Sequence, residues 1–307
     1  METKTYSALR TSSKDYSRQT RSSSLSMIST ITVNYKTVDY LQTMLTSLYA
    51  HHQDRAIEVF VVENGSDDDL SEVQKLFPQV KYLFSKENLG FAGGCNLAIK
   101  QAVGDFVLLL NPDVLFDDDA LYQIEDAMQA NPEVGIGGVS LKNLDQTQQK
   151  CVWHFPRPLD QFLLLLKIPH IVPNIAPIAH WRFDSFDYSK SYDVDQVMGA
   201  FFCIRRSLLD QIGLLDEGYF MWYEEVDYCK RAVDARWKVH YFADIHVRHK
   251  KGSSFDRVET RWKQDVLRAS IRRYMKKFYG DRMFWVFVIF EPLFRLLSLI
   301  ASVVKPV

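Results

Sequence analysis

The apolar residues between positions 28 and 110 follow two alternating patterns. Four segments are β-rich or continuously apolar and are predicted strands: 28–33, 57–62, 80–84 and 106–110. The segments between them carry apolar residues at helical spacing and are predicted helices: 38–48, 70–77 and 93–103. Fully apolar strands that alternate with helices are typical of a parallel sheet covered on both faces. The pattern therefore predicts an α/β fold.

Polar, loop-forming residues follow each predicted strand, at Asn34, 63–65, 85–94 and 111–113. In open α/β sheets, ligands bind at the carboxyl ends of the strands. We therefore expect these four loops to converge on one site.

The alternation is lost after residue 141. Segment 142–193 contains five prolines and is expected to be an irregular insertion that faces an acceptor. A second ordered block follows, with strands at 194–204 and 237–242 and helices at 207–212 and 224–235. A basic helix is predicted at 257–278, before a mostly apolar segment at 283–304.

Charge is unevenly distributed, although the formal net charge is −1. Residues 248–307 hold fourteen basic and five acidic side chains, and the body of the chain is acidic. An acidic body argues against a nucleic-acid groove, and the basic end fits an anionic partner such as a membrane surface.

The four cysteines form no CxxC pair, which disfavours a zinc site or disulfide framework. The first 27 residues contain no apolar signal segment, so we expect a cytoplasmic catalytic body.

Three short segments carry candidate chemistry. The glycine-rich segment 88–96 leads into a helix whose N-terminus could bind an anion, or it is only a tight turn. Asp113 follows a buried strand, where a carboxylate can hold a divalent cation or simply form an Asn-Pro-Asp turn. Glu224 and Glu225 begin a helix after three aromatic residues. They are either partners of the helix dipole or a general base with a raised pKa.

Seven motifs, in this order, resemble the family-two glycosyltransferases of the GT-A fold, particularly the bacterial rhamnosyltransferase-like group. They lie at 33–35, 62–66, 87–96, 110–113, 198–201, 220–227 and 247–249, and the resemblance covers about three-quarters of the chain. It implies a mixed, mainly parallel sheet flanked by helices, with a Rossmann-like nucleotide-binding half and a C-terminal helical tail. The implied organisation is a flexible leader (1–26), a transferase domain (27–254, divided near residue 140) and a tail (255–307).

The resemblance also implies roles for individual residues. Asp113 matches the last Asp of a DXD-type motif that holds Mg²⁺ or Mn²⁺ on the donor diphosphate, and His249 matches a histidine that completes the metal site in some members. Glu225 matches the catalytic base. Members usually have Glu-Asp where this chain has Glu224-Glu225, so the base is one of these two glutamates. The implied substrate-binding residues are Val33, Tyr35, Glu63, Asn64, Asn88, Gly90, Gly93, Asn96, Asn111 and Trp222.

The expected function is inverting, metal-dependent transfer of L-rhamnose from dTDP-rhamnose to a saccharide or lipid-linked saccharide in cell-surface polysaccharide synthesis. The alternatives are a UDP-hexose or UDP-galactofuranose donor, and a non-catalytic module that binds sugar nucleotides.

Segment 283–304 is long enough to span a bilayer, but Glu291, Pro292 and Arg295 interrupt it. A helix lying in the membrane interface therefore fits better than a tail packed on the core or a span, which predicts peripheral association with the inner face of the cell membrane.

Overall fold

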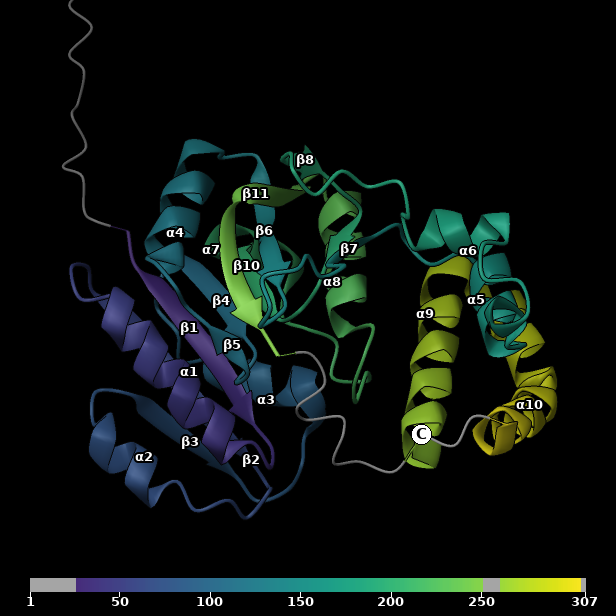
Figure 1. Cartoon of the computed structure of the whole chain (residues 1–307), viewed down its shortest axis with the longest axis horizontal. Coiled ribbons are helices and arrows are strands. Elements are labelled where there is room, and N and C mark those ends of the chain that lie inside the picture. Colours follow the sequence, from purple (N-terminus) through teal and green to yellow (C-terminus); the bar gives the residue numbers. More distant parts are fainter. Residues whose placement is uncertain (1–25, 251–259, 305–307) are drawn as a thin grey trace, which may run out of the picture.

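The computed structural model describes residues 26–250 and 260–304 (Figure 1). In this part of the chain, the main sheet has nine strands in the order β3-β2-β1-β4-β10-β6-β11-β5, and β8 pairs with β11. Its first four strands run parallel: β1 (Ile28–Asn34), β2 (Ile57–Asn64), β3 (Lys81–Ser85) and β4 (Phe106–Leu110). They confirm the parallel sheet that the apolar segments predict. The predicted leader, apart from residue 26, lies outside the described residues.

The second half of the sheet is mixed. The central strand β10 (Phe201–Arg205) lies antiparallel between β4 and β6 (Val134–Lys142), and β11 (Lys238–His249) is parallel to β6. Two short strands, β5 (Val114–Leu115) and β8 (Tyr192–Asp193), pair antiparallel with β11. A small separate sheet joins β7 (Val152–Trp153) to β9 (Gln196–Val197). The sheet thus combines a parallel half with a mixed half, as the resemblance implies.

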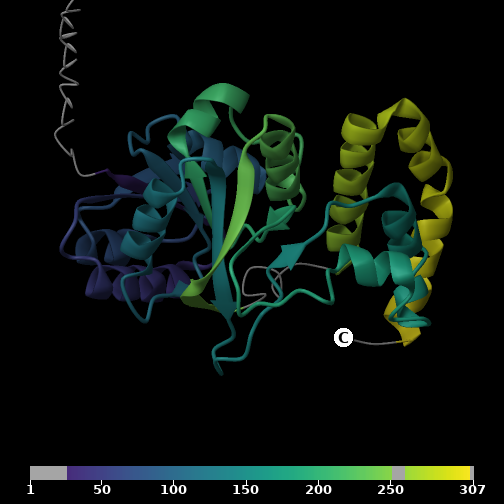
Figure 2. The ribbon, with the colours of Figure 1, turned by 90° about the horizontal axis from the view of Figure 1, so that it is seen from above.

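Helices cover both faces of the sheet (Figure 2). One layer holds α1 (Val38–His51), α2 (Ser71–Leu76) and α4 (Ala120–Ala130), and the other holds α3 (Gly90–Ile99), α7 (Arg206–Ile212) and α8 (Glu224–Asp234). In the first layer, the rings of Tyr49 and Phe77 stack 5.7 Å apart. In the second, the Asn96 side chain of α3 hydrogen-bonds the backbone of Leu215, between α7 and α8.

Several elements of the structure differ from the prediction. Helix α3 begins at Gly90, three residues before the predicted start. Helix α4 and strand β6 were not predicted, because Gly135, Gly137 and Gly138 remove the side chains on which a strand pattern depends. A Cβ on Gly138 would lie 2.6 Å from the Val197 Cβ, so these glycines allow close packing. The predicted strand 194–204 is interrupted between β9 and β10.

The prediction that segment 142–193 is irregular is wrong in part. The segment forms α5 (Pro158–Leu165), a short 3-10 helix (Ile168–His170) and α6 (Ala176–Trp181). A proline occupies the first turn of each. Proline is tolerated there because the first N–H groups of a helix have no intrahelical partner. The prolines in these helices therefore start them rather than interrupting them.

The C-terminal helices form a second, smaller core beside the sheet domain (Figures 1 and 2). Helix α9 (Thr260–Ile289) turns sharply at Gly280 (φ 81°), and α10 (Glu291–Val304) follows. The buried residues of this core come from α5, α9, α10, the first turn of α8 and the segment before it: Leu165, Tyr219, Tyr223, Val226, Ile271, Tyr274, Met275, Phe287 and Phe294. The residues on either side of Glu224 and Glu225 are therefore held by the end of the chain.

Ion pairs fasten α9 to the same segment. The fully buried Asp227 accepts hydrogen bonds from Arg231 (2.7 Å) and lies 2.6 Å from the Lys277 ammonium. Asp216 is 2.6 Å from Arg273 and 2.9 Å from Lys277. Part of the positive charge that predicted an anionic partner is thus used inside the fold.

The ion pairs of Asp216 make the stability of the packing between α9 and the segment before α8 depend on pH. Burial alone would raise the pKa of Asp216, but hydrogen bonds from Arg273, Lys277 and the Gly218 N–H lower it to about 2. A carboxylate with a lowered folded-state pKa stabilises the protein above its unfolded-state pKa of about 4 and loses that contribution as the pH falls to about 2. We expect Asp216→Asn to cost about 2 kcal/mol at pH 7. In urea unfolding from pH 7 to pH 2.5, this difference from wild type should shrink below pH 4; a constant difference would contradict it.

Candidate active site

Asn64, at the end of β2, shapes the loop that enters α3. Its Nδ2 donates to Asn88 Oδ1 and to the Gly90 carbonyl, both at 3.1 Å, and its Oδ1 accepts from the Leu89 N–H at 3.1 Å. The side chain is 2% exposed. All polar atoms of the amide are therefore hydrogen-bonded within the loop, and the implied contact between Asn64 and the substrate stays a prediction.

The ends of β1 and β2 are tied together in a similar way. The Asn34 amide donates to Glu63 and to Asp68 (2.9 Å), and Glu63 Oε1 accepts from the Ser66 N–H at 2.7 Å. Val33 is almost buried, whereas Tyr35, in the loop after β1, is half-buried. Glu63 thus holds the loops of the predicted nucleotide site, and Tyr35 is accessible beside them.

Gly90 brings the start of α3 against the segment before α8. Its φ is +72°, and a Cβ on it would lie 2.3 Å from the Phe220 carbonyl oxygen. That carbonyl accepts a hydrogen bond from the Phe91 N–H at 3.0 Å. Gly94 faces Val33, and a Cβ there would lie 3.0 Å from the valine methyl groups. The glycines therefore serve close packing, and one N–H group at the start of α3 is bonded within the fold.

The structure brings Asp113 and His249 together. Val114 pairs with His249 where β5 meets β11, which places the Asp113 Oδ1 3.2 Å from the His249 Nε2. Both side chains are about 5% exposed. Asn111 Nδ2 lies 3.5 Å from the same histidine nitrogen. A carboxylate, an amide and an imidazole thus meet at the end of β4.

Gln149 sets the tautomer of His249. The Gln149 Nε2 donates to the His249 carbonyl at 2.5 Å, so its Oε1 faces the His249 Nδ1 at 3.0 Å as an acceptor. Nδ1 therefore carries the proton, which in the neutral ring leaves the lone pair of Nε2 directed at the Asp113 carboxylate. Two acceptors 3.2 Å apart require a shared proton or a cation. No sequence pattern singled out Gln149.

This pair fits a divalent cation that a substrate helps to hold. Among residues 26–250 and 260–304, no group of three or more His, Cys, Asp and Glu side chains is placed to hold a metal by itself. Mg²⁺ commonly takes one or two carboxylates together with substrate phosphate oxygens and water. Asp113 and His249 offer the oxygen and nitrogen donors, and the glutamine orients the histidine, as outer partners of metal ligands do.

Glu224 and Glu225 occupy the first two positions of α8. Trp222 and Tyr223 precede them with φ of 64° and 75°, a left-handed pair that non-glycine residues rarely adopt. One carboxylate oxygen of each glutamate is buried without a hydrogen-bond partner. Burial raises the pKa of both carboxyl groups, and the charge of Glu225 raises the pKa of Glu224 further. Glu224 is buried and Glu225 half-buried, so Glu225 is the more accessible.

A short backbone segment connects the glutamates to the Asp113 pair. The Asn111 N–H donates to the Ala200 carbonyl at 3.0 Å. A Cβ on the adjacent Gly199 would lie 3.6 Å from the Glu225 Cβ. The structure therefore assembles Asn111, Asp113, His249 and Glu225 around one end of β4.

Two polar residues at this site serve the fold. The Asn96 Nδ2 donates hydrogen bonds to the Leu215 carbonyl and to Glu217, and its Oδ1 accepts one from the Leu215 N–H. The implied contact between Asn96 and the substrate therefore stays a prediction. Gln161, on α5, is fully buried and accepts a 2.6 Å hydrogen bond from the Tyr223 hydroxyl. It braces the left-handed residue before Glu224, and no sequence signal identified it.

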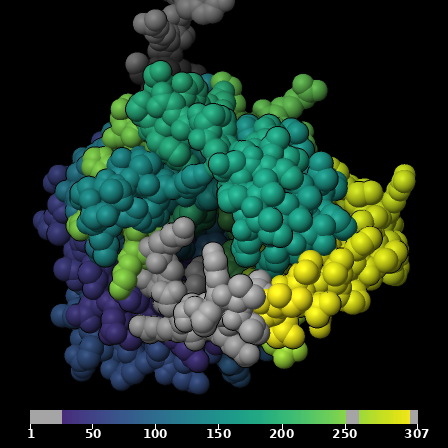
Figure 3. Space-filling model, turned by 45° about the vertical axis from the view of Figure 1, so that its right-hand side comes forward, coloured from purple at the N-terminus to yellow at the C-terminus, as the bar shows by residue number. Residues whose placement is uncertain are grey.

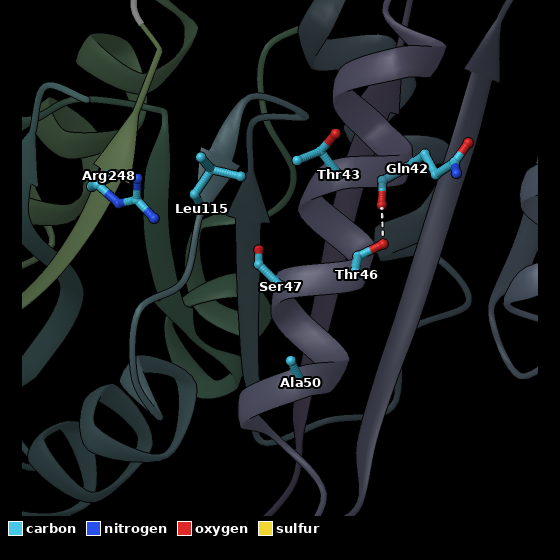
Figure 4. Close-up of a pocket in the computed structure, with 7 residues that line it drawn as sticks. All are labelled: Gln42, Thr43, Thr46, Ser47, Ala50, Leu115 and Arg248. Atoms are coloured by element: carbon cyan, nitrogen blue, oxygen red, sulfur yellow. Dashed lines mark hydrogen bonds between the residues drawn. The ribbon is translucent and has the colours of Figure 1, made fainter.

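None of these residues lines the surface hollow shown in Figure 4. It has a volume of about 410 Å³ and is bordered by α1, Leu115 and Arg248. Arg248 pairs with Asp117, and the α1 residues that border it are small or amide side chains. It offers no acid or base for chemistry, so the candidate site remains the cluster around Asp113 and Glu225.

Comparison with known proteins identifies the family. The family model described as "Glycosyl transferase family 2" matches residues 29–213, which covers more than half of the chain and includes Asp113. This chain belongs to glycosyl transferase family 2. It is therefore a glycosyltransferase, which removes the non-catalytic module from the alternatives.

Two curated relatives of the transferase are rhamnosyltransferases. The chain is 28% identical over 240 residues to N-acetylglucosaminyl-diphospho-decaprenol L-rhamnosyltransferase of Mycobacterium tuberculosis strain H37Rv, covering 74% of this chain and 77% of the relative. It is 26% identical over 250 residues to the rhamnosyltransferase WbbL of Escherichia coli K12, covering 77% and 89%.

Solved structures confirm the GT-A fold of the transferase. GalNAc-T7 with UDP, GalNAc and Mn²⁺ matches with a TM-score of 0.57 at 13% identity, over 81% of this chain and 48% of that one. The transferase thus spans about half the length of that structure. The mannosyltransferase PcManGT from Pyrobaculum calidifontis, with GDP-Man and Mn²⁺, matches with a TM-score of 0.54 at 16% identity, over 91% and 75%.

Proposed function

We propose that the transferase moves L-rhamnose from dTDP-rhamnose to a lipid-linked saccharide, with inversion at the sugar C1 and with a divalent cation. The observation that carries the proposal is the cluster at the end of β4. There, Asp113 and His249 lie 3.2 Å apart, and Gly199 and Ala200 connect them to a half-buried glutamate with an unpaired oxygen. Cell-surface polysaccharide synthesis is the process that this reaction would serve.

The names of two relatives support the proposed donor and acceptor. One curated relative is named for rhamnose transfer to a diphospho-decaprenol-linked saccharide, and another for rhamnose transfer alone. These names favour rhamnose over the alternative UDP-hexose and UDP-galactofuranose donors. A lipid-linked acceptor fits the first name.

The sugar C1 already bears a good leaving group, the nucleoside diphosphate. The protein must deprotonate the attacking acceptor hydroxyl and stabilise the negative charge of the departing diphosphate. Glu224 keeps its proton more firmly, because burial and the neighbouring charge both raise its pKa. Glu225 is the more accessible of the two glutamates and is the one that takes the hydroxyl proton. One base suits a single displacement with inversion.

Asp113 and His249 would hold the cation. When bound, Mg²⁺ or Mn²⁺ neutralises charge on the diphosphate oxygens. Gln149 keeps the His249 Nε2 in its acceptor form, and Asn111 lies beside it. These residues are therefore arranged for a metal–diphosphate complex rather than for a metal held by protein alone.

A thermal-shift titration with nucleotides tests the donor site. We expect dTDP with Mn²⁺ to stabilise the wild type by about 2.7 kcal/mol at one hundred times its dissociation constant, and UDP or GDP to stabilise it less. In Asp113→Ala, the Mn²⁺-dependent part of this shift should disappear, since the carboxylate at the end of β4 is removed. The matched control is Asp54→Ala, which removes an exposed carboxylate elsewhere and should keep the full shift.

The outcomes separate the alternatives. A shift with UDP but not dTDP would replace rhamnose by a UDP-linked sugar. A metal-dependent shift that survives in Asp113→Ala would contradict the metal assignment. Incubation with dTDP-rhamnose and a lipid-linked saccharide then tests transfer directly, and a product with retained configuration at C1 would exclude the single displacement.

A further inference from the structure

The second half of α9 and the start of α10 carry large apolar side chains on the surface. We call residues 281–300 the C-terminal arm. Trp285 is 58% exposed, Ile289 70% and Leu296 53%. Phe287 and Phe294, in the same arm, are buried in the second core. The arm is thus amphipathic in the folded protein, with one side packed and another side apolar and exposed.

The exposed residues fall on continuous helical faces. Residues three or four positions apart share one side of an α-helix. Leu293, Leu296 and Ile300 have this spacing in α10, and Trp285 and Ile289 have it at the end of α9. In Figure 3 the yellow C-terminal helices extend along the outside of the molecule, next to the teal helices of the insertion.

The acidic residue within the arm is neutralised inside the protein. Glu291 lies 3.0 Å from Arg268 and 2.5 Å from Arg272, both on the first half of α9, and its side chain is 17% exposed. Arg295, one turn along α10, also contacts it at 2.8 Å. The charge that interrupts the apolar segment in the sequence is therefore compensated by α9.

The arm is suited to lie along a bilayer rather than to cross it. Within the described residues, no single helix has the length and apolar character of a membrane span. The α9 and α10 helices meet those criteria only as a pair, with a bend of 51° between them. Amphipathic helices with Trp and Leu on one face and cations nearby typically lie in the membrane interface.

Charge favours an anionic surface as the partner. Residues 261–300 contain nine basic and three acidic side chains. Asp216 and Asp227 neutralise part of this charge through Arg273 and Lys277, and an excess of cations remains. Anionic lipid headgroups attract such segments by about 1 kcal/mol for each cation near the surface.

We propose that the apolar face of the C-terminal arm, formed by Trp285, Ile289, Leu293, Leu296 and Ile300, docks on an anionic lipid bilayer. The first half of α9 lies between this face and the candidate active site. Its Ser270 Oγ donates a 2.9 Å hydrogen bond to the carbonyl of Met221, a residue three positions before Glu224. Docking therefore presents the catalytic segment to the membrane. The docking itself does not depend on the proposed function. Only its advantage in bringing the enzyme close to a lipid-linked acceptor rests on that function.

Vesicle flotation of the full chain, without donor or acceptor, tests the proposal. We expect wild-type protein to float with phosphatidylcholine vesicles that contain phosphatidylglycerol. Leu293→Ser/Leu296→Ser should lower the partition constant at least about tenfold, because two exposed leucines leave the bilayer. The matched control is Leu76→Ser/Val103→Ser, which removes exposed apolar side chains from the sheet domain and should float as the wild type does.

Deleting the arm is a weaker test, because it would also remove Phe287 and Phe294 from the second core. The melting temperature of each double variant shows that it is folded. A wild type that does not float, or a Leu293→Ser/Leu296→Ser variant that floats equally well, would overturn the proposal. So would a wild-type dimer in light scattering that this variant converts to a monomer, since the face would then bind a second copy of the chain.

Discussion

Glu225→Gln is expected to abolish sugar transfer and to leave donor binding intact. The glutamine has the same shape but cannot accept the proton of the acceptor hydroxyl, and losing a general base typically costs 10² to 10⁴-fold in rate, roughly. The thermal shift with dTDP and Mn²⁺ should stay at the wild-type value, because Asp113 and His249 are unchanged. Turnover and thermal shift, measured on the same preparation, separate the two effects.

Glu224→Gln is the matched control. Glu224 occupies the adjacent position, is more buried and has a pKa that burial and the Glu225 charge both raise, so its amide variant should lose far less activity than Glu225→Gln. The wild-type rate should also rise with pH as Glu225 ionises, from a pKa that burial holds above the usual value. Near-normal turnover in Glu225→Gln, with loss in Glu224→Gln, would reverse the assignment.

Gly90→Ala is expected to lower both stability and turnover strongly. An alanine there would adopt a φ of +72°, and its Cβ would lie 2.3 Å from the Phe220 carbonyl oxygen. The left-handed backbone alone costs about 1 kcal/mol, and relieving the clash must separate α3 from the segment before α8. That movement breaks the Phe91–Phe220 hydrogen bond, four residues before Glu224. Urea unfolding and the initial rate of transfer measure the two losses.

Gly213→Ala isolates the steric part of this prediction. Gly213 has a φ of +78°, close to that of Gly90, and nothing lies within 4 Å of a Cβ built on it. Its ψ of −167° lies in a region that is nearly restricted to glycine, so this variant should show a backbone cost alone, about 1–3 kcal/mol, and keep its turnover. If the two alanine variants proved equally stable and active, the approach of α3 to Phe220 would not matter for the site.

The sequence predicted the parallel half of the fold well, because its strands are fully buried. Leu108, Leu109 and Leu110 of β4 are 0% exposed, and such continuous apolar strands stand out from their helices. Strand β6 was missed because its glycines pack closely without adding to the apolar pattern. The helices of segment 142–193 are hard to predict because proline breaks a helix in its interior, although it favours the first helical turn.

The candidate site was predictable where the chemistry lies in one short motif. Asp113 and Glu225 stand in such motifs, and the structure places both near the end of β4. Gln149 and Gln161 were not predictable, because each acts through one long-range hydrogen bond that no local pattern records. Tertiary contacts of this kind decide the histidine tautomer and the bracing of Tyr223.

The second core, which contains residues on either side of Glu224 and Glu225, also sets the order in which parts of the protein fold during translation. Tyr219, Tyr223 and Val226 flank the two candidate glutamates, and their packing partners Ile271, Tyr274, Phe287 and Phe294 come from helices α9 and α10, which are translated after the sheet domain. The sheet strands can pair earlier, while the ribosome is still extending the chain. The segment around Glu224 and Glu225 acquires this packing only after α10 emerges, so nascent and prematurely terminated chains carry the strands of the sheet without the packing that holds these two glutamates.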